Sequence, residues 1–257
     1  MFRVSGDAYD FFMGRWSRRL APALAEAAGI TAGRRLLDVG CGPGALTGVL
    51  VELVGPSSVA ACDPSEPFVA ACAERHPGVD VRQAAAEDLP WPDQAFDVVL
   101  AQLVLNFVRD RAAAAAEMTR VLRPGGTVAT AVWDYGEGME MLRVFWDEAV
   151  KLKPDGDSRD ERHMPFCREG DLAALWRLHG LQDIVEERLT IETQFASFAD
   201  YWGPFLEKQG PAGAYVATLS GRERDELEGR LRGRLLGQGP DRAFVLEARA
   251  WAVRGER

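Results

Sequence analysis

The chain has 257 residues, of which 47% are hydrophobic and 27% charged, with a formal net charge of −9. This composition excludes a largely disordered chain, and the length allows one large domain or two small ones. The acidic charge argues against nucleic acid as a partner, because phosphate binding needs a basic surface. No hydrophobic run approaches the ~20 residues of a membrane helix, and no secretory leader is visible. The four cysteines lack zinc-site spacing. We therefore expect a cytoplasmic protein with reduced cysteines, no metal and no membrane partner.

Short hydrophobic runs alternate with amphipathic stretches from about residue 35 onward. The pattern predicts strands over 35–39, 58–62, 79–82, 96–100 and 127–132, with helices over 44–54, 65–76 and 110–122 between them. This alternation is typical of βαβ units that build a parallel sheet.

The pattern changes after residue 135. It predicts helices over 139–151 and 170–180, a strand over 184–191, and a last strand over 243–253. Between these two strands we expect a helical stretch from 197 to 236, broken near Gly203-Pro204 and Gly210-Pro211. The prediction is a doubly wound α/β fold with seven strands, a helical insertion before the last strand and an N-terminal helical arm.

The segment 36–44 reads LLDVGCGPG and predicts a strand that enters a glycine turn and then a helix. Glycines let the backbone turn sharply and let a ligand approach closely. Gly40, Gly42 and Ala45 also fit the dinucleotide fingerprint GxGxxG/A. The alternative is a glycine-rich turn that binds nothing.

Two acidic positions follow at the ends of later strands. Asp63 ends the second strand, 21 residues after Gly42, where a carboxylate can accept hydrogen bonds from both hydroxyls of a ribose. Alternatively, the run from Asp63 to Ser65 only caps the next helix. Glu87 and Asp88 follow the third strand, where they either accept from an adenine amino group or form a solvated loop.

These motifs occur in the order seen in class I S-adenosylmethionine-dependent methyltransferases. The stretches at 84–101, 122–133 (LRPGGTVATAVW) and 248–255 complete the pattern. The sequence resembles this family, in the small-molecule branch similar to ubiquinone- and menaquinone-biosynthesis C-methyltransferases. The resemblance is close over 33–135 and looser elsewhere. It implies a Rossmann-like, mostly parallel seven-stranded sheet whose antiparallel last strand lies beside the fifth.

The resemblance also implies a division of one domain into four parts. Residues 1–34 form an N-terminal helical arm or lid, and 35–135 form the cofactor-binding core. Residues 136–242 supply the rest of the core with a helical substrate cap, and 243–257 supply the final strand.

S-adenosylmethionine is the implied cofactor, with S-adenosylhomocysteine as its product. The glycine turn would hold the methionine part, Asp63 the ribose, and Glu87 or Asp88 the adenine, while Gln102 and Asn106 would line the passage to the acceptor. The predicted cofactor-binding residues are Tyr9, Arg15, Asp38, Gly40, Cys41, Gly42, Gly44, Asp63, Pro64, Ser65, Glu87, Asp88, Leu89, Gln102 and Asn106.

The acceptor side is predicted from aromatic residues and one histidine. We expect Trp16, Trp133, Tyr201 and Trp202 to bind the substrate, although aromatic residues at helical spacing also form ordinary cores. The aromatic arm either closes over the cofactor or packs on the domain surface. His163 is the candidate general base, needed only if the acceptor arrives protonated, and otherwise a surface histidine.

The predicted activity is transfer of a methyl group (EC 2.1.1.-) to a small organic acceptor by in-line displacement, in a monomer or homodimer. One alternative is an NAD(P)-dependent oxidoreductase on a Rossmann fold. The acidic loop at 87–88 and the lack of a Tyr-x-x-x-Lys pair argue against it. The other alternative is a non-catalytic protein that binds S-adenosylmethionine.

Overall fold

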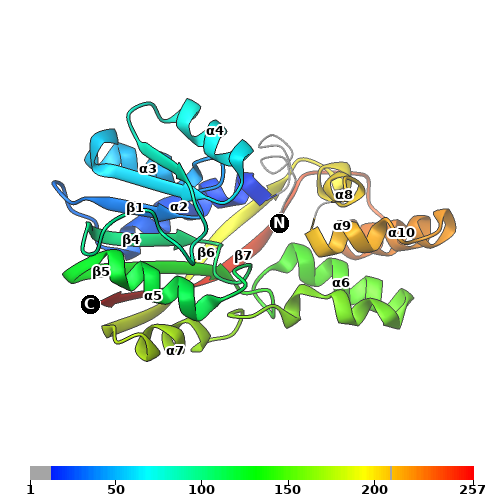
Figure 1. Cartoon of the computed structure of the whole chain (residues 1–257). Coiled ribbons are helices and arrows are strands. Elements are labelled where there is room, and N and C mark those ends of the chain that lie inside the picture. Colours follow the sequence, from blue (N-terminus) through cyan, green and yellow to red (C-terminus); the bar gives the residue numbers. More distant parts are fainter. Residues whose placement is uncertain (1–12, 209) are drawn as a thin grey trace. The chain divides into compact units, whose positions relative to one another are not determined.

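The computed structural model describes residues 13–208 and 210–257 (Figure 1). Their contacts divide these residues into two compact units. Unit 1 contains residues 13–132, Arg168–Leu189 and Ala250–Arg257. Unit 2 contains Trp133–Cys167 and the described residues of Thr190–Arg249.

One seven-stranded sheet has the order β3-β2-β1-β4-β5-β7-β6. The strands are β1 (Leu36–Val39), β2 (Val59–Asp63), β3 (Asp80–Gln83), β4 (Phe96–Gln102), β5 (Leu122–Trp133), β6 (Gln182–Phe195) and β7 (Phe244–Glu256). β1 pairs in parallel with β2 and β4, β2 with β3, and β4 with β5. β7 runs antiparallel beside β5; at the strand ends Gly125 N–H donates to the carbonyl of Arg257, and Arg257 N–H donates to the carbonyl of Gly126. The predicted sheet is therefore confirmed.

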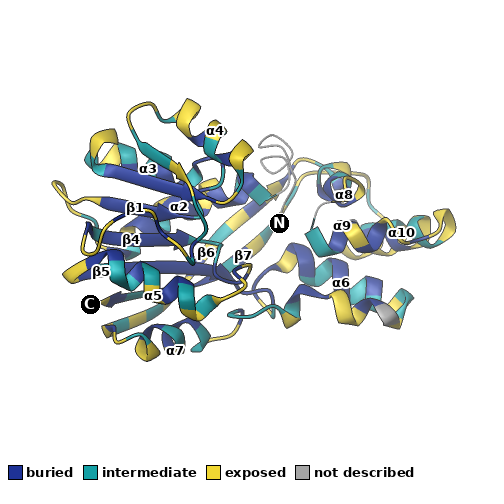
Figure 2. Cartoon of the chain, in the orientation of Figure 1, coloured by how far each residue is buried: buried dark blue, intermediate teal, exposed yellow. Residues whose placement is uncertain are grey.

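The helices of unit 1 cover buried strands. They are α2 (Arg15–Ala27), α3 (Ala45–Val54), α4 (Glu66–Arg75), α5 (Arg111–Val121) and α7 (Asp171–Leu178), with a 3-10 turn η2 (Pro56–Ser58). Every residue of β1 is buried (Figure 2). The described part of the N-terminal arm includes α2, which contacts α3 and β4 and buries Trp16, Leu20 and Leu24.

Unit 2 is built mainly from helices around an aromatic core. The elements are α6 (Glu140–Leu152), η3 (Pro154–Arg159), η4 (Glu161–His163), α8 (Phe198–Leu206), α9 (Gly210–Val216) and α10 (Gly221–Leu236). Phe145 stacks on Phe205 with a centroid distance of 4.6 Å, and Tyr215 meets Phe145 edge to face. Ser220 and Glu223 form a capping box that starts α10.

Two predicted boundaries are wrong. α8 continues through Gly203 and Pro204, because Pro204 lies in its last turn and the helix ends two residues later. β5 starts at Leu122 rather than 127, since the backbone of Arg257 pairs with Gly125 and Gly126 and draws this glycine-rich segment into the sheet.

Among the described residues, no helix is both long and apolar enough to cross a membrane. The same residues contain no group of three or more His, Cys, Asp or Glu side chains placed to bind a metal.

Candidate functional site

The register of the parallel strands brings three predicted segments to one edge of the sheet in unit 1. Val39 of β1 pairs with Cys62 of β2, and Asp38 pairs with Leu100 of β4. The next residues along these strands are the glycine turn, Asp63 and Gln102. Carboxyl ends of parallel strands are where open α/β sheets bind their ligands.

The glycine turn is pinned to the neighbouring strand. The backbone N–H groups of Gly40 and Cys41 both donate to the carbonyl of Cys62, at 2.7 and 2.9 Å, and Gly44 N–H donates to Cys41. Gly40, Gly42 and Gly44 have φ angles of 73°, 53° and 95°, in the left-handed region that favours glycine.

The three glycines face different surroundings. A Cβ atom at Gly40 would lie 2.4 Å from Cγ2 of Val104, and one at Gly44 would lie 2.6 Å from Nε2 of His76. A Cβ at Gly42 would meet no atom of the described residues within 4 Å. Helix α3 begins directly after Gly44, which makes no side-chain cap. The turn therefore has an open side at Gly42, next to a helix N-terminus that favours negative charge.

Asp63 ties this open side to the next strand. Its side chain is buried, at 8% exposure, and its two oxygens accept from the N–H groups of Gly42 at 3.0 Å and Ser65 at 2.8 Å. Burial raises the pKa of Asp63, while the two hydrogen bonds act in the opposite direction. A carboxylate offers about four acceptor positions, so capacity remains for ligand hydroxyls. Asp63 thus braces the turn that leads to α4 and still has acceptor capacity to spare.

Asp38 lies beneath the turn. It is 1% exposed and accepts a hydrogen bond from the hydroxyl of Thr47, at 2.7 Å, in the first turn of α3. Burial raises the pKa of Asp38 to about 7, although the bond from Thr47 lowers it in part. These contacts make Asp38 a group that positions the turn from below, while its predicted contact with the methionine part stays a prediction.

The acidic loop after β3 is anchored by α5. Leu89 is buried, and its N–H donates to Glu117 while its carbonyl accepts from Arg120. Glu87 is half-buried, and Asp88 is exposed. Sequence reasoning missed Glu117 and Arg120, whose spacing of three residues on a helix was the available signal.

The segment that leaves β4 carries buried amide groups. Nε2 of Gln102 donates to the carbonyl of Ser17 in α2 at 3.0 Å. Oε1 of Gln102 and both amide atoms of Asn106 have no hydrogen-bond partner among residues 13–208 and 210–257. The guanidinium of Arg15 lies 4.2 Å from the ring of buried Trp16. Tyr9 lies outside the described residues.

The predicted acceptor residues of unit 2 lie in different settings. Tyr201 is completely buried and donates its hydroxyl proton to the carbonyl of Met141 at 2.9 Å, which places it in the aromatic core. Trp133 and Trp202 are also buried, and the part of the chain that the structure describes offers no acceptor to either indole N–H.

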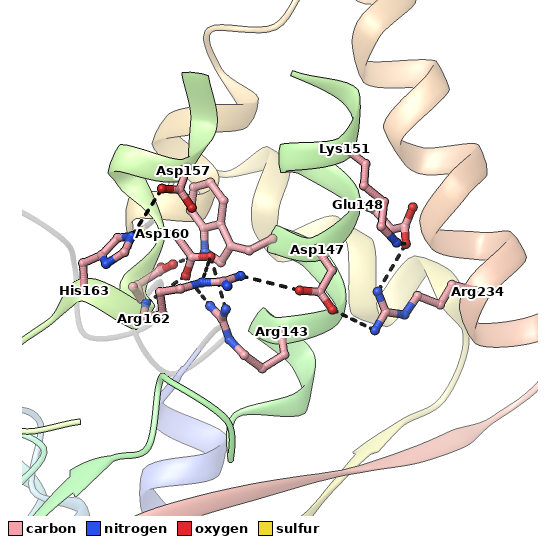
Figure 3. A network of polar contacts seen from close by, with 11 residues as sticks. Arg143, Asp147, Glu148, Lys151, Asp157, Asp160, Arg162, His163 and Arg234 are labelled. Atoms are coloured by element: carbon pink, nitrogen blue, oxygen red, sulfur yellow. Dashed lines mark hydrogen bonds and ion pairs between the residues drawn. The ribbon is translucent and has the colours of Figure 1, made fainter. Parts of the chain in front are cut away.

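His163 lies on the surface of unit 2, within a network of charged side chains (Figure 3). Its Nε2 is 3.6 Å from Asp157, and both side chains are about half exposed. Asp147 bridges Arg162 and Arg234, and Glu148 pairs with Arg234 as well. Nothing in these contacts prepares His163 for proton transfer, so its role as a base stays a prediction.

A hollow of about 440 Å³ lies over this network. Its lining is Asp147, Glu148, Val150, Lys151, Asp157, Arg162 and Arg234. Three acids and three bases contribute to it, so the hollow presents no net charge to a ligand.

The chain resembles known proteins in its sequence and in its fold. Residues 37–130 match the family described as a methyltransferase domain. An uncharacterized protein of Mycobacterium tuberculosis is 35% identical over 218 residues, which cover 81% of this chain and 78% of that protein.

A relative of Mycobacterium ulcerans with a functional name covers less of each chain. It is the "Probable phthiotriol/phenolphthiotriol dimycocerosates methyltransferase 2", 41% identical over 101 residues, or 38% of this chain and 39% of its own length. This match therefore spans about two fifths of the relative. A solved structure of a SAM-dependent methyltransferase from Thermotoga maritima has a TM-score of 0.54 at 19% identity, covering 97% of this chain and 98% of that one. At that identity the likeness shows the fold alone.

Proposed function

This chain belongs to the class I S-adenosylmethionine-dependent methyltransferases, and we propose that it transfers the methyl group to a small organic acceptor. S-adenosylmethionine is the methyl donor. The observation that carries the proposed site is the glycine turn, whose open side at Gly42 adjoins a buried carboxylate with acceptor capacity to spare.

The residues at this edge fit the parts of the donor. The N-terminus of α3, where Gly44 makes no side-chain cap, suits the methionine carboxylate, because N–H groups at a helix N-terminus and the helix dipole favour an anion. Asp63 suits the ribose hydroxyls, and Glu87 or Asp88 with Leu89 suits the adenine. No phosphate is present in this donor, which agrees with the acidic character of the chain.

The chemistry demands mainly alignment. When bound, the sulfonium supplies a methyl carbon already activated for in-line displacement by an electron pair of the acceptor. The turn, braced by the bond of Asp63 to Gly42 and the bond of Asp38 to Thr47, would hold the donor in one position. Correct alignment of two reactants can remove ~7–11 kcal/mol from a barrier. A base is needed only if the acceptor arrives protonated.

The acceptor is the finer part of the proposal. The acidic charge favours a small molecule over nucleic acid, and the relative from Mycobacterium ulcerans is named for phthiotriol and phenolphthiotriol dimycocerosates. Trp133 and Trp202, whose indole N–H groups have no acceptor among the described residues, are better candidates for acceptor contacts than Tyr201, whose hydroxyl is bonded to Met141. Membership of the quinone C-methyltransferase branch, and a monomer or homodimer, stay predictions.

Calorimetric titration with S-adenosylmethionine, S-adenosylhomocysteine, NADH and NADPH tests the proposal. We expect the first two alone to bind. Asp63→Ala should weaken S-adenosylhomocysteine binding at least ~100-fold, because each hydrogen bond to a charged group contributes ~1.5–3 kcal/mol. Asp157→Ala, the same change on the surface of unit 2, should leave the affinity unaltered.

Three results would contradict parts of this assignment. Unchanged affinity in a folded Asp63→Ala protein would remove Asp63 from the site, with folding checked by circular dichroism. Binding of a nicotinamide cofactor would favour the oxidoreductase alternative. Tight binding without turnover on any of a panel of alcohols, phenols and amines would favour the non-catalytic alternative.

A further inference from the structure

Asn106 is a buried side chain with unusual hydrogen bonding. It is 3% exposed, and among the described residues neither Nδ2 nor Oδ1 has a hydrogen-bond partner. A carboxamide offers two donors and two acceptor positions, and buried polar groups in native proteins are nearly always bonded. A ligand that supplies the missing partners explains this arrangement.

The backbone around Asn106 is held in an unusual conformation. Leu103 has a φ of 62°, and its N–H donates to the carbonyl of Ala131 in β5 at 2.8 Å. Phe107 N–H donates back to Val104 at 2.8 Å, which closes a turn around Asn106. A left-handed leucine costs conformational energy, and such strain concentrates at functional sites. The segment is therefore fixed, so the unpaired carboxamide belongs to a well-defined turn.

This turn lies against the glycine turn. Val104 fills the space that a Cβ at Gly40 would occupy. Gly40 begins the part of the site that we assign to the methionine end of the donor, whereas the loop of Glu87 and Leu89 is anchored by α5 at the adenine end. Asn106, two residues beyond Val104, thus belongs to the end of the donor that carries the sulfonium.

We propose that the carboxamide of Asn106 hydrogen-bonds a neutral hydroxyl group of the methyl acceptor, next to the transferred methyl. A hydroxyl donates to Oδ1, accepts from Nδ2 and keeps a second lone pair for the methyl carbon. A carboxylate or phosphate would satisfy Nδ2 only and leave Oδ1 facing an anion, and an amine would have no lone pair left for the methyl. The acceptor is therefore a neutral alcohol or phenol at its reacting end. This inference rests on the proposed function.

Sinefungin provides a probe that does not require the acceptor to be known. In this analogue of S-adenosylmethionine, an amine on carbon replaces the methyl on sulfur, so its ammonium projects toward the place where the acceptor binds. S-adenosylhomocysteine has no group there. Comparing the two ligands by calorimetry therefore isolates contacts at the methyl position.

Asn106→Leu, of similar size, should weaken sinefungin binding at least tenfold and change S-adenosylhomocysteine binding less than threefold. Its stability should not fall, because an unpartnered polar group is replaced by an apolar one. Asn106→Asp should strengthen sinefungin binding several-fold, since a carboxylate then faces the ammonium, again with little effect on S-adenosylhomocysteine.

Other results would overturn the inference. Equal losses for both ligands in Asn106→Leu would place Asn106 against a part that they share. No change for either ligand would show that Asn106 does not face the methyl position. A wild-type protein that binds S-adenosylhomocysteine keeps the proposed function intact in both cases, whereas one that binds neither ligand contradicts the proposed function and the inference with it.

Discussion

Two regions rich in polar side chains differ in how their hydrogen-bonding capacity is used. In the network of unit 2, each labelled charged residue faces a partner, as Asp160 does between Arg143 and Arg162 (Figure 3). At the glycine-turn edge of unit 1, Asp63 keeps acceptor positions open and Asn106 has both amide atoms unused among the described residues. We infer that the charged network of unit 2 serves the structure, while the acceptor capacity of Asp63 and the amide of Asn106 serve the proposed ligand.

The largest expected effect on stability comes from disrupting the charged network of unit 2. Arg143→Met leaves the fully buried carboxylate of Asp160 with Arg162 as its remaining cationic partner among the described residues, which should cost about 3–5 kcal/mol of unfolding free energy. Urea unfolding measures this loss, and calorimetry should show unchanged S-adenosylhomocysteine affinity in the folded variant. The control Lys151→Met removes an exposed partner of Glu148 and should cost less than ~1 kcal/mol. A folded Arg143→Met protein with weakened ligand binding would make the network part of the site.

Substitutions in the glycine turn of unit 1 separate effects on stability from effects on ligand affinity. Gly42→Ala should cost about 1–2 kcal/mol for its left-handed backbone, and Gly40→Ala should cost about 2–4 kcal/mol because its Cβ also overlaps Val104. Gly42→Ala, although the more stable, should still bind S-adenosylhomocysteine weakly, since its methyl group enters the open side. Urea unfolding and calorimetry on both variants separate the two effects. Normal ligand affinity in Gly42→Ala would show that the ligand does not approach there.

The pH dependence of stability gives a smaller effect in both regions. Burial raises the pKa of Asp38 and of Glu161 to about 7 each. Because the folded state holds the proton more tightly, the stabilisation is complete below the ordinary carboxyl pKa and is lost as pH rises through 7. Each group should lower the unfolding free energy by about 1.4 kcal/mol between pH 6 and pH 8.

Neutral variants separate these two carboxyl groups. Asp38→Asn and Glu161→Gln should each remove one such slope in urea titrations across that range. Only Asp38→Asn should also alter S-adenosylhomocysteine affinity, because Asp38 supports the turn through Thr47. A slope that persists in both variants would assign the titration to other groups.

The fold was largely predictable because its signals are local. The alternation of hydrophobic runs with helices indicated the strands that the sheet contains, and the motifs identified the family and the donor. The extension of β5 was not predictable, since it depends on backbone pairing with Arg257 at the other end of the chain. The helix through Pro204 was missed because a proline in a last turn costs little.

The residues of the candidate site could be proposed from the sequence, but their burial and bonding could not. Strand ends and glycine spacing pointed to Asp63, since carboxyl ends of parallel strands share one edge, and the family resemblance pointed to Asn106. The burial of Asp38 beneath the turn and the unused amide of Asn106 depend on which distant groups pack around them. The anchoring of Leu89 by Glu117 and Arg120 has the same origin.

The reactivity of the cysteines near the glycine turn depends on how they are buried. Cys41 and Cys72 are both buried; a hydrogen bond with Cys72, together with burial, raises the pKa of the Cys41 thiol. Alkylating reagents react with the thiolate, so a thiol that stays protonated reacts with them slowly. Alkylation of Cys41 therefore requires the turn to open, and the alkylation rate reports how often it opens. Mass spectrometry of alkylated Cys41 therefore measures local motion of the glycine turn without any engineered residue.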